Sequence, residues 1–226
     1  MKEKDRRETI ERYENRLRQF GYSPETLGWG KQGRQEVRFG VLSQPILEFS
    51  DSSVLDVGCG FADLYDFLVA HGWHGTYCGI DIVPGLLKAA KARHPDLDLY
   101  EGDIASDALQ WVKYDYVVAS GVFNAKLSDG DNLEYIELSL RNMLHLANSA
   151  VCVDFMSTYV DFQDPKGWHT DPVWAFTLAK KLSRRVVLRH DYMPYEFALF
   201  IYCDDSISMR NVFQVTDALL SSGRLP

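Results

Sequence analysis

The sequence lacks any apolar run of the roughly 18–20 residues that a helix needs to cross a bilayer. Its N-terminal stretch, residues 1–21, is rich in charged side chains and has no apolar core of the signal-peptide type. We therefore expect a cytoplasmic protein with no membrane partner. At 46% hydrophobic and 25% charged residues, the chain has the composition of a globular protein that buries a core.

Cysteine is scarce, and the four cysteines form no Cys-x-x-Cys pair. They are Cys59, Cys78, Cys152 and Cys203. Three of them lie in apolar runs that are typical of strands, so we expect buried free thiols rather than a disulfide or a zinc site. His71 and His74 lie three residues apart, but no cysteine or carboxylate is near them in the sequence. No metal site is predicted.

Positively charged residues are fewer than negatively charged ones. The chain of 226 residues carries 24 Lys and Arg against 32 Asp and Glu, which gives a net charge of −8. Such a chain lacks the electrostatic footprint of a protein that binds duplex nucleic acid, so DNA is not expected as a partner. A local basic patch is still compatible with this balance. The length suits one α/β domain with a small appendage.

Residues 1–50 are predicted to form a helical N-terminal extension, and residues 51–226 a single domain. The extension begins with an amphipathic helix over 3–20, whose charged residues we interpret as a solvated face. A break containing Gly and Pro follows, and then a second helix over 34–49 with Pro45 as a kink or junction. The sequence leaves open whether the extension is a lid, a dimer arm or both, and a homodimer is compatible with it.

Short apolar runs alternate with helical segments from residue 52 onward. The expected strands are 52–58, 75–82, 96–104, 114–120 and 150–156. This alternation predicts a mostly parallel, doubly wound α/β sheet with helices on both faces. Two further strands, 183–192 and 195–203, are joined by a turn at Met193 and Pro194 that is too short for a crossover helix. We therefore predict seven strands, of which the last is antiparallel.

A glycine-rich turn follows the first strand in VLDVGCGFADL, residues 54–64. The strand ends near Asp56, and Gly58, Cys59 and Gly60 form the turn before a helix. Glycine lets the backbone turn sharply and approach a ligand without a Cβ atom in the way. The following helix offers free N–H groups at its N-terminus. A plain strand–helix turn gives the same pattern, so the turn alone is a weak signal.

Two further acids end the next two strands. Asp81 ends the second strand, where a carboxylate can bind both hydroxyls of a ribose. Asp103 follows the third strand in EGDI, where it or its neighbouring backbone can meet the amine of an adenine. Each acid alone has the alternative of a helix cap or a surface residue. Together with Asp56 they are expected to line one crevice at the carboxyl ends of the strands.

These motifs resemble those of the class I S-adenosylmethionine-dependent methyltransferases. VLDVGCGFADL is similar to the first motif of that family, GIDI to the second, EGDI to the third and YDYVVASGVFN to the fourth. The resemblance covers about residues 52–203, and the terminal hairpin matches the seventh strand of the family's Rossmann-like fold. Ala62 occupies the position of the third glycine in the usual pattern. We expect this replacement to require only slightly wider packing of the helix. ASGVFN and HDYMPYEF together look like a group of small bacterial methyltransferases without a defined substrate.

The resemblance implies S-adenosylmethionine as the cofactor. The cofactor-binding residues that we predict are Asp56, Gly58, Cys59, Gly60, Asp81, Ile82, Asp103, Ile104, Ser120 and Arg38. Asp56 and the glycine turn would face the methionyl part, Asp81 the ribose, and Asp103 the adenine edge. Ile82 and Ile104 would contact the adenine, and the backbone near Ser120 would close over the methionyl end. Arg38 is a candidate for a bidentate contact with the cofactor carboxylate, with a plain surface arginine as the alternative.

The catalytic candidates are Asn124, Tyr159 and His190, which lie in segments that can reach the acceptor site. Each has an ordinary structural alternative. Asn124 is equally expected as a plain loop residue, Tyr159 as a packing aromatic, and His190 as a hairpin-end residue that satisfies backbone groups. The segment around Trp29, Lys31, Gln35 and Arg38 is a candidate lid. Methyl transfer mainly requires positioning of the acceptor and exclusion of water.

The predicted reaction is methylation of an oxygen or nitrogen atom of a small molecule. The base-methylating signature Asn/Asp-Pro-Pro-Tyr is absent, and no cysteine nucleophile follows the fourth strand. A methyltransferase that modifies RNA or protein is the alternative within enzymes. A non-catalytic cofactor-binding protein of the same fold is the alternative outside them. A nicotinamide-dependent dehydrogenase is a weaker third interpretation, since the third glycine is missing and the terminal hairpin does not fit it.

Overall fold

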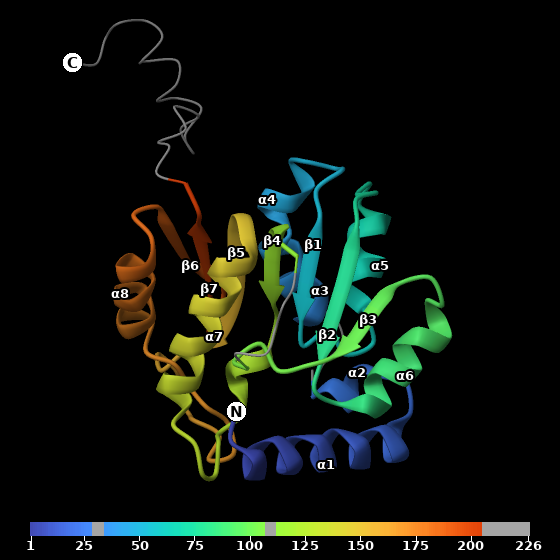
Figure 1. The fold of residues 1–226 in the computed structure, drawn as a ribbon. Helices are drawn as coiled ribbons and strands as arrows, with labels where there is room; N and C mark the ends of the chain where they lie inside the picture. Colours follow the sequence, from blue (N-terminus) through green and yellow to red (C-terminus); the bar gives the residue numbers. More distant parts are fainter. Residues whose placement is uncertain (29–33, 107–111, 205–226) are drawn as a thin grey trace, which may run out of the picture.

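One seven-stranded sheet forms the centre of the molecule, in the strand order β3-β2-β1-β4-β5-β7-β6 (Figure 1). The computed structural model describes residues 1–28, 34–106 and 112–204. The strands are β1 (Val54–Val57), β2 (Tyr77–Asp81), β3 (Asp98–Glu101), β4 (Tyr114–Ala119), β5 (Ala147–Met156), β6 (Val186–Met193) and β7 (Glu196–Tyr202). Strands β1 to β5 pair in parallel, and β7 is antiparallel to both β5 and β6. The predicted fold class is confirmed.

Helices cover both faces of the sheet. They are α1 (Glu3–Phe20), α2 (Pro24–Leu27), α3 (Arg34–Leu42), α4 (Gln44–Leu47), α5 (Asp63–Ala70), α6 (Pro84–Arg93), the 3₁₀ turn η1 (Val122–Asn124), α7 (Asn132–Leu146) and α8 (Pro172–Leu182). Buried side chains of α7 and α8 form the core on one face, and those of α3, α4 and α5 form it on the other. Strands β1 and β2 are buried along their whole length, because a parallel sheet of this kind is covered on both sides.

The order in which the strands are added to the sheet reverses at β1, which makes β1 part of a topological switch point. Strands β2 and β3 lie on one side of it and β4 and β5 on the other. A crevice forms at such a switch point, outside the carboxyl ends of the strands. Helix α1 lies across this edge of the sheet, along the bottom of Figure 1. Its apolar stripe of Ile10, Tyr13 and Leu17 packs with Val83 and Leu86 at the start of α6.

Some predicted elements differ in detail. The helix expected over 34–49 is divided into α3 and α4, with Pro45 in the first turn of α4, so the expected junction is confirmed. The short helix α2 was not predicted, because Gly and Pro dominate the residues around it. The domain boundary at residue 50 stays a prediction. None of the described helices is long and apolar enough to span a bilayer.

The expectation of buried thiols is wrong for one cysteine. Cys59, Cys78 and Cys152 are buried, and all four cysteines are free. Cys203 is exposed, because β7 ends at Tyr202 and the next residue leaves the sheet. Its position after the strand, rather than within it, explains the difference.

A buried carboxylate fastens the first turn of α1 to the loop after β4. Asp5 is only 2% exposed. It accepts hydrogen bonds from the backbone N–H groups of Ser128 at 2.6 Å, Asp129 at 3.0 Å and Gly130 at 2.8 Å. Burial alone would raise the pKa of Asp5, but these hydrogen bonds outweigh it and lower that pKa. Asp5 thus connects the N-terminal helix to the sheet edge.

We expect Asp5→Asn to lower the free energy of unfolding at about pH 7 by about 1–3 kcal/mol, the usual cost of losing hydrogen bonds to a buried charged group. The folded pKa lies below the unfolded one, so this stabilisation is present above about pH 4 and is lost as the pH falls through the folded pKa. Urea denaturation at neutral and acidic pH measures the difference, with the exposed Asp129→Asn as the control. A difference between wild type and Asp5→Asn that does not change with pH would contradict the assignment.

Candidate functional site

A cavity of about 740 Å³ opens at the carboxyl ends of β1, β2 and β4. Its floor is made by residues that follow these strands and β3. Its cover comes from α1, from Leu27 and Gly28, and from α3. The loops after β4 and β5 form the remaining wall. All ten residues predicted to bind the cofactor line the cavity, Arg38 from α3, and Asn124 lines it as well.

The glycine turn after β1 places backbone without Cβ atoms at the wall of the cavity. Gly58 and Gly60 have φ of 71° and 55°, in the left-handed region that favours glycine. A Cβ atom on Gly58 would lie 2.5 Å from Cγ2 of Val122, so no larger residue fits without a shift. Ala62 also has a left-handed backbone, with φ of 62°. The missing third glycine therefore costs backbone strain, about 1–2 kcal/mol, and not only the wider helix packing that the sequence suggested.

Asp56 is held at the end of β1 by a tyrosine hydroxyl. The Tyr77 O–H donates to Oδ2 of Asp56 at 2.6 Å, and Asp56 is 4% exposed. Burial raises the pKa of Asp56 to about 7, with the hydrogen bond from Tyr77 opposing this and the charge of Asp81 adding to it. A carboxylate in such a place is stabilised by any cation that enters the cavity. Tyr77 was not predicted as a site residue.

Asp81 ends β2 with both carboxylate oxygens engaged by backbone. Oδ2 accepts from the N–H of Gly60 at 2.9 Å, and Oδ1 accepts from the N–H of Val83 at 2.8 Å. Burial raises its pKa to about 6, and the backbone donors oppose this. These bonds connect the glycine turn to the second strand. Ile82, the next residue, lines the cavity as predicted.

Asp103 lies on the opposite side of the floor, where α1 and α7 meet it. Its carboxylate accepts from the amino group of Met1 at 2.6 Å, from the Tyr135 hydroxyl at 3.1 Å and from the Ala105 N–H at 3.0 Å. Ile104 is buried and lines the cavity beside it. Tyr135 was not found from the sequence, since a tyrosine inside an amphipathic helix looks like any other packing residue.

The loop after β4 is held by a buried acid on β5. Asp154 accepts from the Ser120 hydroxyl at 2.8 Å and from the Gly121 N–H at 2.7 Å. Burial raises the pKa of Asp154, and the charge of Arg38 opposes this. Arg38 is buried and makes a two-bond ion pair with Glu196 at the start of β7. Its guanidinium thus lines the cavity while it is bound to a protein carboxylate.

Neither Asp154 nor Glu196 was predicted from the sequence. The signal for Asp154 was a charged residue inside the apolar run AVCVDFM, which a strand buried on both faces does not tolerate without a partner. No comparable signal exists for Glu196, whose partner Arg38 is 158 positions away in the chain. A contact between residues so distant in sequence depends on the tertiary fold.

The three catalytic candidates are not gathered in one place. Asn124 lines the cavity, and its side-chain oxygen accepts from the Met156 N–H at 2.9 Å. The rings of Tyr159 and His190 stack, with centroids 6.1 Å apart, but neither residue lines the cavity. Tyr159 is 61% exposed. Nε2 of His190 is buried with no hydrogen-bond partner in the described part of the chain.

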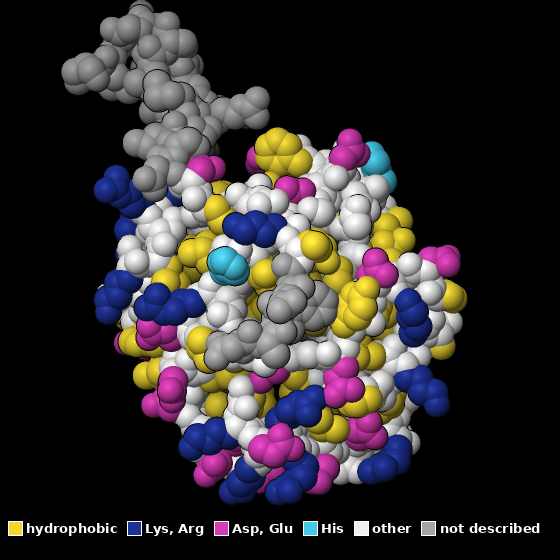
Figure 2. Space-filling view, in the orientation of Figure 1, with side chains coloured by type: hydrophobic (Ala, Val, Ile, Leu, Met, Phe, Trp, Pro, Cys, Tyr) yellow, Lys and Arg dark blue, Asp and Glu magenta, His cyan; other side chains and the backbone are white. Residues whose placement is uncertain are grey.

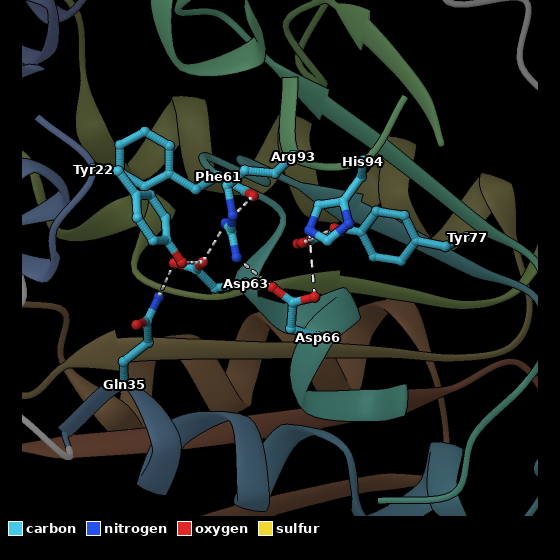
Figure 3. Close-up of polar contacts among 9 residues, drawn as sticks. Tyr22, Gln35, Phe61, Asp63, Asp66, Tyr77, Arg93 and His94 are labelled. Atoms are coloured by element: carbon cyan, nitrogen blue, oxygen red, sulfur yellow. Dashed lines mark hydrogen bonds and ion pairs between the residues drawn. The ribbon is translucent and has the colours of Figure 1, made fainter. Parts of the chain in front are cut away.

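A polar network behind the glycine turn connects the N-terminal extension to α5 and α6 (Figure 3). Asp63, the first residue of α5, accepts from the Tyr22 hydroxyl at 2.7 Å, from Nε2 of Gln35 at 3.1 Å and from Nη1 of Arg93 at 3.0 Å. The Arg93 guanidinium also lies 4.0 Å from the centroid of the Tyr22 ring. Of the candidate lid residues, Gln35 is therefore tied to Asp63, whereas Trp29 and Lys31 lie outside the described residues.

Sequence comparison finds relatives with a consistent description. A family profile described as a methyltransferase domain matches residues 54–145. A protein of Mycobacterium tuberculosis named as a candidate methyltransferase, Rv1506c, is 32% identical over 158 residues, which are 66% of this chain and 92% of that one.

Solved structures with the same fold are more distant in sequence. The magnesium protoporphyrin IX methyltransferase of Synechocystis PCC 6803, with bound S-adenosylmethionine, has a TM-score of 0.63 at 15% identity and covers 88% of this chain and 97% of its own. A TehB-like methyltransferase of Corynebacterium glutamicum has a TM-score of 0.57 at 19% identity and covers 87% of this chain and 99% of its own. At these identities the likeness concerns the fold.

We expect Asp56→Asn to raise the free energy of unfolding of the ligand-free protein at about pH 8, because it removes a buried charge and keeps an acceptor for Tyr77. The folded pKa of about 7 lies above the usual value of about 3.9. Between these values the folded state binds the extra proton, so the stability of wild type falls as pH rises through this window. The difference in the free energy of unfolding between Asp56→Asn and wild type should therefore become smaller toward about pH 4. Thermal denaturation across this range measures it, with Asp161→Asn on an exposed loop as the control. A variant less stable than wild type at every pH would contradict the interpretation.

Proposed function

The chain belongs to the class I S-adenosylmethionine-dependent methyltransferases, and on this premise we propose that it methylates an oxygen or nitrogen atom of a small molecule. One observation carries the proposal: the acids that end β1, β2 and β3 surround a single cavity beside a glycine turn. The cavity volume of about 740 Å³ falls within the range of small-molecule sites. Its cover by α1 and α3 favours a compact acceptor over a polymer.

The residues of the cavity fit the cofactor in charge and in shape. Asp56 and Asp81 are buried acids, and burial raises both pKa values because the surrounding protein compensates their negative charge only in part. A ligand with positive charge on sulfur and on an amino group supplies that compensation. The turn at Gly58 offers backbone where a Cβ atom would collide with Val122. When bound, S-adenosylmethionine supplies the methyl group on its positively charged sulfur.

We assign roles to the floor residues by their order along the sheet edge. Asp81 accepts hydrogen bonds from the ribose hydroxyls while it keeps its backbone donors, since each carboxylate oxygen has two acceptor sites. Ile82 and Ile104 enclose the adenine, and Asp103 lies at its edge. Asp56, on the floor of the cavity, compensates the positive charge of the cofactor's ammonium group.

Backbone at the loop after β4 closes the methionyl end. Ser120 and Gly121 are fixed there by Asp154, whose two hydrogen bonds leave the loop little freedom. Arg38 contributes its charge from α3 while Glu196 keeps its guanidinium in position. The fixed position of this loop matters because a small displacement of the reacting atoms strongly lowers the rate of methyl transfer.

For the acceptor we propose that Asn124 orients the reacting group at the cavity wall. We also propose that the stacked pair of Tyr159 and His190, which lies outside the cavity lining in this conformation, handles the proton of an acceptor that must lose one. The buried, unpartnered Nε2 of His190 supports this, because such a nitrogen has no structural hydrogen bond to lose among the described residues. The Tyr159 ring stacks with this imidazole, and Tyr159 is itself exposed.

We expect Asp81→Ala to weaken binding of S-adenosylhomocysteine by about 1–3 kcal/mol, the scale of hydrogen bonds to a charged group. Isothermal titration calorimetry measures the affinity. The matched control is Asp96→Ala, which removes an exposed acid before β3 and should bind like wild type. Equal affinity of Asp81→Ala and wild type would refute the ribose assignment.

Tyr159→Phe and His190→Ala should leave the affinity for S-adenosylhomocysteine nearly unchanged and lower the rate of methyl transfer. The readout is formation of S-adenosylhomocysteine from S-adenosylmethionine across a panel of hydroxyl- and amine-bearing small molecules. Tyr195→Phe, in the exposed turn between β6 and β7, is the control for loss of a tyrosine hydroxyl. Full activity of both variants on an accepted substrate would exclude the pair from catalysis.

A further inference from the structure

A second concave surface lies at the other end of the sheet, where β4 and β5 begin and β7 ends. It is a groove of about 790 Å³ between the last turns of α7 and α8. Basic side chains from three segments of the chain line it: Lys113, Arg141, His145, Lys180, Lys181 and Arg184. We call this surface the basic groove. Lys and Arg side chains gather near α7 and α8 in Figure 2, on the left of the view, with a histidine beside them.

The basic groove departs from the charge balance of the whole protein. It contains five of the 24 Lys and Arg residues, and none of the 32 Asp and Glu residues lines it among the described residues. The chain as a whole carries a net charge of −8. A concave cluster of one sign focuses the electrostatic field and attracts ions of opposite sign. The cluster is therefore a site for an anion on an otherwise acidic protein.

Helix ends explain only part of this cluster. Cations are favoured in the last turn of a helix, where carbonyl groups carry partial negative charge. This accounts for His145 at the end of α7 and for Lys180 and Lys181 at the end of α8. Lys180 also donates to the Arg184 carbonyl group. Lys113 lies just before β4 and belongs to no helix, so helix ends do not explain its place in the groove.

Three of the cations, Arg141, Lys113 and Lys181, keep their charge available for a ligand. Arg141 pairs with Glu137 one helical turn away at 2.7 Å, and both side chains are about half exposed. Such an exposed pair contributes little free energy, so Arg141 exchanges this partner for a ligand at small cost. Lys113 and Lys181 make no ion pair within the described part of the chain.

We propose that the basic groove binds a small molecule that carries a polyphosphate group. A compact anion of several charges matches a cluster of cations gathered in one hollow. A long polyanion would extend beyond the groove, and the protein's net charge of −8 would repel that part of it. The apolar part of Leu144 and Leu182 and the ring of Tyr202 add a non-polar wall for the rest of such a molecule. This site is independent of the proposed methyl transfer.

Isothermal titration calorimetry of the full chain with inorganic tripolyphosphate tests the site. S-adenosylhomocysteine is present throughout, so that the cavity at the other end of the sheet is filled. Wild type should bind tripolyphosphate, with an affinity that falls as salt is raised from about 50 to 200 mM. The double variant Lys113→Glu with Lys181→Glu should lose roughly tenfold or more in affinity, since it replaces two attractive charges with repulsive ones.

The control double variant Arg7→Glu with Lys88→Glu makes the same change in net charge at exposed positions outside the groove. It should bind tripolyphosphate nearly as wild type does. Both double variants should bind S-adenosylhomocysteine like wild type, which separates this site from the proposed function. No binding of tripolyphosphate by wild type, or equal loss in both double variants, overturns the proposal.

Two further titrations identify the source of the phosphate. ATP that binds more tightly than tripolyphosphate, with the same sensitivity to Lys113→Glu and Lys181→Glu, supports a nucleotide. ATP that binds no more tightly supports a ligand recognised by its phosphates alone. A short single-stranded RNA that binds while tripolyphosphate and ATP do not overturns the proposal in favour of a nucleic-acid surface.

Discussion

Parallel strands that end on acids bring like charges to one edge of a sheet, and most of the site is arranged around this electrostatic constraint. Asp56 and Asp81 lie at neighbouring strand ends, in a cavity that removes them from water. The fold compensates them in part with a tyrosine hydroxyl and with backbone N–H groups of the glycine turn. The compensation is incomplete, since both pKa values stay raised. A ligand with positive charge in this cavity would complete it, and part of its binding free energy would then come from relief of this unfavourable electrostatic interaction.

A second buried charge cluster serves the opposite purpose. Arg38 of α3 forms an ion pair with Glu196 of β7, and its charge also favours the ionised form of Asp154 on β5. Burial of such a cluster adds little stability, because desolvation offsets the attraction. It does fix geometry: the N-terminal extension is held to the sheet, and the loop after β4 is held at Ser120 and Gly121.

Local patterns in the sequence were sufficient for the fold and for the floor of the site. Continuous apolar runs between helical segments predicted the parallel sheet, and acids at the ends of those runs predicted Asp56, Asp81 and Asp103. The left-handed backbone of Ala62 escaped prediction because alanine carries no sign of it. Partners such as Glu196 and Tyr135 escaped because their roles depend on residues far away in the chain. The acceptor side was the least predictable part, since it is built from loops whose course no periodicity describes.

The attachment of α1 has a consequence for how the cavity is reached. The helix is held at its start by Asp5, beyond its end by Tyr22 on Asp63, and between them by one apolar stripe. Arg6 of the helix also pairs with Glu101 at the end of β3 at 2.6 Å, and both side chains are partly exposed. Because the helix lies outside the hydrogen-bonded strands, its detachment would leave the sheet paired, and local opening of this kind costs less free energy than unfolding of a whole domain. Residues of α1 line the cavity, so a ligand that enters by such local opening would have a rate of entry linked to the stability of this one helix.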